Sequence, residues 1–191
     1  PPPPPAANPV ATRPLAAVPP LTVVLQPVKD KPIVAIRVVF HTGSVDDPPG
    51  KEGLTALTTA VLSEGGPQEL TSAQLLEALY PMAAELDGHL DKELTVFEGR
   101  VHTDKLDRFL QIFTDVLLRP RFDPKEFDRL RTVALNTVKT RLRQENDEEL
   151  GKVGLDALLY PGHPYRHHVG GTVAGLGSIT LDDVKAHWQP V

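Results

Sequence analysis

The sequence contains no cysteine, and this absence excludes a disulfide framework, a thiolate metal site and a cysteine nucleophile. It also lacks any run of 18 consecutive apolar residues, so no transmembrane segment is expected. Basic residues are too few for a nucleic-acid-binding surface, because 20 Lys and Arg stand against 25 Asp and Glu, a net charge of -5. What remains is the composition of a globular protein, with 40% apolar and 24% charged residues.

Proline is concentrated at one end of the chain, where nine of the 20 prolines lie in the first 20 of the 191 residues. That segment carries one charge, Arg13, and few large apolar side chains, so it cannot bury enough surface to offset its loss of chain entropy. We predict a disordered, polyproline-like linker over residues 1–20, with a ligand for a proline-recognition module as the alternative. A proline-rich tether near the N-terminus suits an exported protein, so an extracytoplasmic location (periplasmic or lipid-anchored) is expected.

From residue 21 onward, strand patterns come first and helical patterns dominate afterwards. The β-branched runs predict strands over 21–28 and 32–44, and alternating polarity predicts two more within 89–101. Apolar spacing predicts helices over about 52–63, 72–86, 105–120, 123–161 and 178–188. The second is expected to kink or stop at Pro81, and the fourth to be interrupted near Asn146 and Asp147. The last is expected to open with a capping box formed by Thr180 and Asp183. The fold class is therefore α+β.

Four stretches of the chain resemble, in this order, one half of a pitrilysin/insulinase-type zinc metallopeptidase, the family of the mitochondrial processing peptidase. They are residues 38–65, 86–101, 117–131 and 159–190, of which the last, containing LYPGHPYRHHVGGT, is the most specific. The resemblance implies an antiparallel sheet flanked by helices, one half of a clamshell that closes with a second half around a peptide-binding chamber. Family halves continue into a final strand, so residues 21–191 are expected to form an N-terminal half domain truncated before that strand.

Active members of this family carry His-x-x-Glu-His in the first helix, because histidines at i and i+4 lie on one helical face and reach one zinc ion. A glutamate from a distant helix completes the site. In this chain the two histidine positions fall on Ala56 and Ala60, the general-base position on Thr59 and the distant ligand near Thr137. Alanine has no donor atom and a threonine hydroxyl is a poor zinc ligand. We therefore expect no catalytic residue, no bound zinc and no cofactor in this chain.

The resemblance thus implies the family fold without the family chemistry. Such halves are expected to act as non-catalytic subunits, binding peptide substrate beside a zinc-bearing subunit of the same family or beside their own C-terminal half. The chain alone is then no enzyme, although it would belong to a zinc metalloendopeptidase complex. Because a half-clamshell exposes an apolar inner face, a heterodimer or a homodimer is expected. The alternative function is a structural scaffold with no peptidase role.

A relocated metal site is the remaining enzymatic alternative. His89, Asp91 and Glu93 alternate along a predicted strand and would share one face of it. His163, with His167 and His168, forms a second cluster in a loop rich in proline and glycine. For the first group a solvated strand face is the competing interpretation, and for the second it is loop packing and hydrogen bonding.

Overall fold

The computed structural model describes residues 22–28, 31–144 and 147–189, and the chain divides into two units, residues 1–31 and 32–191. In the first unit, residues 22–28 form neither strand nor helix. The predicted strand over 21–28 is therefore wrong for these residues. Val24 and Leu25 are 84% and 86% exposed, and β-branched or apolar side chains favour a strand only when the backbone finds a partner. The predicted linker over residues 1–20 lies outside the described residues.

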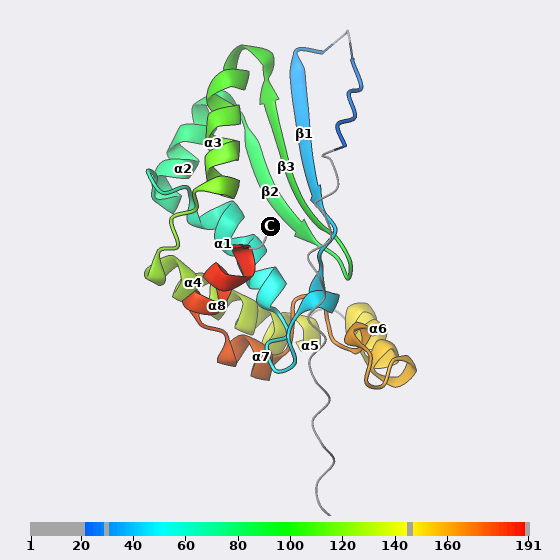
Figure 1. Ribbon diagram of the computed structural model, residues 1–191. Helices are drawn as coiled ribbons and strands as arrows, with labels where there is room; N and C mark the ends of the chain where they lie inside the picture. The colour runs from blue at the N-terminus through cyan, green and yellow to red at the C-terminus, as the bar shows by residue number, and fades with distance from the viewer. Residues whose placement is uncertain (1–21, 29–30, 145–146, 190–191) are drawn as a thin grey trace, which may run out of the picture. The chain divides into compact units, whose positions relative to one another are not determined.

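The second unit contains a sheet backed by helices, as the α+β prediction requires (Figure 1). Its strands are β1 (Ile33–Phe40), β2 (Glu85–Leu90) and β3 (Thr95–His102). Its helices are α1 (Leu54–Gly65), α2 (Ser72–Leu79), α3 (Leu106–Leu118), α4 (Pro124–Asn136), α5 (Leu142–Gln144), α6 (Asp147–Leu159), α7 (Val173–Ser178) and α8 (Leu181–Trp188), with a π-helical turn at Thr137–Arg141 between α4 and α5.

The described strands pair antiparallel in the order β1–β3–β2, so β2 lies at an edge of the sheet. Along the central strand β3, Phe97 and Val101 are buried while Arg100 and His102 are exposed. This alternation follows from the two-residue period of a strand and turns one face of the sheet toward the helices. Figure 1 shows α2 and α3 together on that side of the sheet.

Two apolar clusters form the core. The first joins β3 to α2 and α3, with Leu75, Phe97 and Phe109 among its buried members. The second joins α1, α4, α7 and α8, with Leu57 and Leu176 among its buried members. Helix α1 contributes to both, since Leu62 belongs to the first cluster and Leu57 to the second. The helix that carries the family's zinc positions is thereby fixed between the two parts of the core.

The positions at which the helices begin and end are set by capping and turn residues more than by the spacing of apolar residues. α1 begins at Leu54, two residues after the predicted start, because Gly53 takes a left-handed conformation (φ 108°) that no other residue adopts easily. The capping box of Thr180 and Asp183 is confirmed at the start of α8. Helix α7 was not expected from the sequence, because VAGLGS has too short an apolar pattern. The break predicted near Asn146 falls partly outside the described residues.

Candidate functional site

Helix α1 presents Ala56 and Ala60 one turn apart on the same face, as the family's zinc-ligand positions require. Both residues are half-buried. Ala60 packs against the second apolar cluster, which includes Phe127 and Val138. At the second of these two positions, the helix surface therefore forms a small apolar contact with the neighbouring helices.

Thr59, at the general-base position, lies beneath the edge strand. Its side chain is buried, and its hydroxyl donates to the Thr55 carbonyl at 2.8 Å. Its Cγ2 lies so close to Gly88 of β2 that a Cβ at Gly88 would stand 2.7 Å from it. Only a glycine fits at that point of β2 unless the Thr59 or Ser63 side chain moves. The hydroxyl is thus used inside α1, while the methyl group packs against the strand.

Thr137, near which the resemblance places the distant ligand position, lies in the π-helical turn after α4. Its hydroxyl donates to the Val133 carbonyl at 3.0 Å. The next residue, Val138, is buried in the same cluster that Ala60 contacts. The fold therefore brings the distant segment to α1, as in a zinc site, but joins the two by apolar packing.

A polar network that was not found from the sequence fixes the start of α1. The Asp47 carboxylate accepts hydrogen bonds from the Gly53 amide at 2.7 Å and from the Thr55 amide and hydroxyl at 2.8 and 2.7 Å. The Nε2 atom of His187, on α8, lies 3.1 Å from the Thr55 hydroxyl oxygen. Burial lowers the pKa of His187 despite the nearby Asp47 charge. Neutral His187 therefore ties α8 to the first turn of α1.

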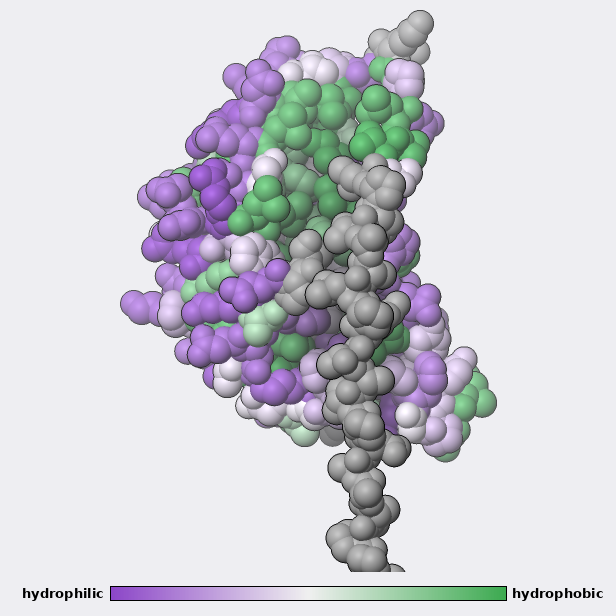
Figure 2. Space-filling model, viewed as in Figure 1, coloured by the Kyte–Doolittle hydropathy of each residue, from purple (hydrophilic) through white to green (hydrophobic). Residues whose placement is uncertain are grey.

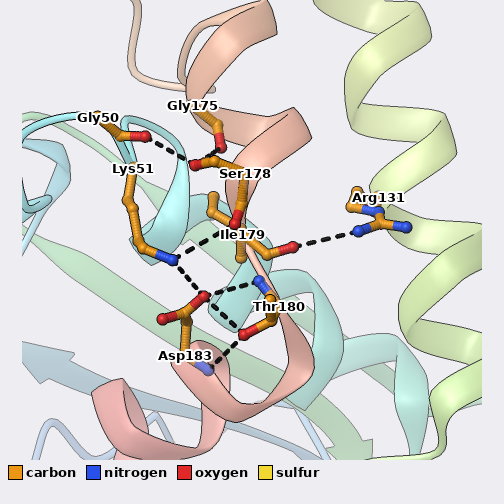
Figure 3. A network of polar contacts seen from close by, with 8 residues as sticks. All are labelled: Gly50, Lys51, Arg131, Gly175, Ser178, Ile179, Thr180 and Asp183. Carbon is orange, nitrogen blue, oxygen red and sulfur yellow. Dashed lines mark hydrogen bonds and ion pairs between the residues drawn. The ribbon is translucent and has the colours of Figure 1, made fainter.

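A second network, drawn in Figure 3, holds the start of α8 against the loop that precedes α1. The Lys51 ammonium lies 2.5 Å from the Asp183 carboxylate, which also accepts the Thr180 amide at 2.8 Å and hydroxyl at 2.7 Å. The Ser178 hydroxyl donates to the Gly50 carbonyl at 2.7 Å. The Lys51 hydrogen bond, followed by those from Thr180, lowers the pKa of Asp183 to about 2. The carboxylate is thus charged throughout the physiological range.

Among the described strands, β2 has one edge that pairs with no other strand, and this edge lies beside α1. The Asp91 amide donates to the Leu94 carbonyl at 2.8 Å. This bond fixes which residues of β2 form hydrogen-bonded pairs with β3, because bonded and non-bonded pairs alternate along an antiparallel ladder. In the register of the β2–β3 pair, the backbone N–H and C=O groups of Asp87 and His89 then bond to β3. The backbone groups of the residues between them point away from β3, toward the outer edge of the sheet. Among the described residues, no other segment hydrogen-bonds to these outward backbone groups, which belong to Leu86, Gly88 and Leu90.

The first alternative metal group is not assembled by the fold. His89 Nε2 lies 3.2 Å from a Glu98 carboxylate oxygen, whereas Asp91 lies in the turn beyond β2. The Glu93 carboxylate accepts a hydrogen bond from the Tyr165 hydroxyl. Over residues 22–28, 31–144 and 147–189, no three His, Asp or Glu side chains gather in a way that could hold a metal ion.

The histidine-rich loop is held by hydrogen bonds. His163 Nδ1 accepts the Tyr165 amide at 3.2 Å, and His167 is buried with its Nδ1 atom 3.0 Å from the His168 carbonyl. Lys92, in the β2–β3 turn, donates to the Tyr165 and His167 carbonyls at 2.7 and 2.6 Å. Burial lowers the pKa of His168. The side chains of His163 and His167 thus bond within the loop, which is the hydrogen-bonding role that the sequence suggested, while Lys92 ties the loop backbone to the sheet hairpin.

Comparison with known structures shows that the chain has the fold of M16 peptidase domains. The crystal structure of a peptidase M16 inactive domain from Pseudomonas fluorescens aligns with a TM-score of 0.77 at 25% identity. A protease from Helicobacter pylori shares the fold, with a TM-score of 0.70 at 19% identity. Each alignment covers 84% of this chain and 39% of the other, so this chain spans about two fifths of either structure.

The sequence comparison identifies the family itself. The insulinase family (peptidase family M16) matches residues 22–168, which is most of the chain. The chain belongs to this family, as the four stretches of resemblance predicted, and it lacks the family's His-x-x-Glu-His motif. The curated proteins contain no match to it. Within the described residues, no helix has the length and apolar character needed to cross a membrane.

Proposed function

We propose that this chain is a non-catalytic wall of a peptide-binding chamber, which a zinc-bearing subunit of the same family or its own C-terminal half completes. The observation that carries the proposal is the open edge of β2 beside α1, where Gly88 lies against Thr59. A peptide would bind to this wall while a partner's zinc performs the cleavage. Membership in peptidase family M16 supports this assignment.

Strand addition is the binding mode that the edge favours. An extended peptide paired with β2 would exchange hydrogen bonds with Leu86, Gly88 and Leu90. Such bonds involve only main-chain atoms, so affinity depends little on the peptide's sequence. The side chains of α1 beneath β2 near this edge are small, since Thr59 and Ser63 are the residues nearest to Gly88. They leave room for varied side chains and supply neither a base nor a metal ligand.

Amide hydrogen exchange tests this mode directly. On addition of an unfolded peptide of about 12 residues, exchange at the Leu86, Gly88 and Leu90 amides should slow, because they gain acceptors. The Asp87 amide, which already bonds to β3, is the internal control and should not change. Binding that leaves the three outward amides unprotected would place the peptide elsewhere and overturn the proposal.

A peptide carrying single backbone N-methyl groups supplies a matched control. Methylation at residues whose amides face β2 should abolish binding, whereas methylation at the alternate residues should not. Equal loss at both sets of positions would indicate that side chains, rather than strand pairing, determine binding.

The partner is tested by isolating the native protein under mild conditions and identifying the chains that accompany it. We expect a chain bearing His-x-x-Glu-His in equal amount, and chelator-sensitive peptide cleavage by the pair. This chain alone should show none, because Ala56 and Ala60 offer zinc no donor. Chelator-sensitive cleavage that persists in the purified single chain would refute the non-catalytic assignment.

A further inference from the structure

Helix α6 is exposed in a way that its sequence does not favour. It has 13 residues, all of them described, and none is buried. Helices of this length are marginal in water without packing, and α6 also contains two glycines, which are poor helix formers. Figure 1 shows it at the lower right, away from α2 and α3. The helix therefore lacks the packing that would stabilise it.

The polarity of α6 is inverted relative to an ordinary surface helix. Its inner side carries two acidic residues on either side of the half-buried Val153: Asp156 lies 3.4 Å from the Lys92 ammonium, and Glu149 lies 3.8 Å from His168. Its outer side carries Leu155 and Leu158, which are 54% and 80% exposed. Figure 2 shows a hydrophobic patch at the corresponding lower right of the molecule. A surface helix normally turns its apolar face to the core, so an outward apolar face indicates a contact with another molecule.

The outer face of α6 is complementary to itself. Gly151 and Gly154 lie on the same face as Leu155 and Leu158, by the helical periodicity, and a side chain at either glycine would meet nothing within 4 Å. In an antiparallel pair about a two-fold axis near Gly154, the leucines of each copy would enter the space above the glycines of the other. One surface thus supplies both the projections and the hollows that a two-fold contact needs.

The charges at the two ends of α6 favour the same arrangement. Asp147 and Glu148 open the helix, whereas the exposed residues His163 and Arg166 lie in the loop that follows it. The Arg166 side chain makes no hydrogen bond or ion pair with any described residue. Antiparallel pairing would bring the acidic start of each helix to the basic loop of its partner, and would also oppose the helix dipoles favourably.

We propose that α6 is the contact surface of a homodimer, in which two copies of this chain pair α6 against α6 in antiparallel orientation. The contact is a single helix pair about 20 Å long, which is small for a stable interface, so dissociation in the micromolar range is expected. The proposal is independent of peptide binding at β2, because the edge strand takes no part in it.

Disulfide trapping provides the sharpest test, because the natural sequence has no cysteine. In the full chain, Gly154→Cys should form a covalent dimer rapidly on mild oxidation, since position 154 lies near the proposed axis. Leu76→Cys, on α2 and also exposed (68%), is the matched control and should cross-link far more slowly. Equal cross-linking rates for the two variants would overturn the proposal.

Light scattering of the cysteine-free chain gives a second readout. At about 200 µM the wild type should be dimeric and Leu158→Glu monomeric, with unchanged circular dichroism because Leu158 is exposed. Leu76→Glu, the control, should dimerise as the wild type does. A monomeric wild type at this concentration, or a Leu158→Glu variant that still dimerises, would show that α6 does not join two copies of this chain.

Discussion

Replacement of Asp183 by asparagine should destabilise the protein at neutral pH and much less in acid. The Asp183 carboxylate accepts hydrogen bonds from Lys51 and from the amide and hydroxyl of Thr180, so it both caps α8 and joins that helix to the loop before α1. Asparagine keeps one oxygen acceptor but loses the charge, so the half-buried Lys51 ammonium no longer has an anionic partner.

The size of the effect follows from the pKa of Asp183, which falls from its ordinary value of 3.8 to about 2 in the folded protein. Realised in full, this difference corresponds to roughly 2.4 kcal/mol of unfolding free energy. The side chain is 26% exposed, and solvent screening reduces the contribution to about 1–1.5 kcal/mol. Because the folded pKa is the lower one, the stabilisation is complete above pH 3.8 and is lost as the pH falls through about 2.

Urea unfolding of the wild type and Asp183→Asn at pH 7 and at about pH 2 measures this difference. We expect the gap between the two proteins to be about 1–1.5 kcal/mol at pH 7 and to shrink in acid. Asp182→Asn is the control, because that side chain is 91% exposed and should change stability by less than about 0.5 kcal/mol. A gap of the same size at both pH values, or no gap beyond that of the control, would refute the electrostatic argument.

Two further predictions concern α1 and the strand above it. Gly88→Ala should destabilise the fold by about 1–3 kcal/mol, because the new methyl group meets Thr59 at 2.7 Å. Gly177→Ala, whose Cβ enters open space, should be neutral or slightly stabilising in the same thermal unfolding assay, and equal losses in both would contradict the contact. The double variant Ala56→His/Ala60→His should bind Zn²⁺ with a 1:1 stoichiometry by calorimetry, whereas the wild type and Ala56→His alone should not, since i and i+4 imidazoles share one face. Equal binding by the single and double variants would contradict that placement.

Local sequence signals predicted the elements that local chemistry controls. Gly65 and Gly66 end α1, Pro81 stops α2, and Thr180 with Asp183 opens α8, because each of these residues acts on the backbone within one helical turn. The strand predicted over 21–28 is absent from the described residues, because strand formation depends on distant rather than local contacts. A β-branched run becomes a strand only if a distant segment pairs with it, which propensity cannot decide.

The candidate site likewise combines features that the sequence predicts with features that only the tertiary structure shows. The assignment of the zinc-ligand positions to Ala56 and Ala60 rests on the family resemblance and stays a prediction, whereas their i and i+4 spacing on one helix is a local fact. The sequence could not reveal that a histidine side chain from α8, that of His187, contacts Thr55 of α1. Those residues are 132 positions apart in the chain, and only tertiary packing brings them together.

The sequence by itself determined the family, the α+β class and the absence of histidine from α1, because these depend on residue identity, order and helical spacing. Only the tertiary structure decided that Thr59 lies beneath Gly88 at an open strand edge, and that α6 turns leucines outward. Edge exposure and the orientation of a helix depend on which other segments are packed nearby. Those contacts are set by the whole chain and cannot be read from any one segment.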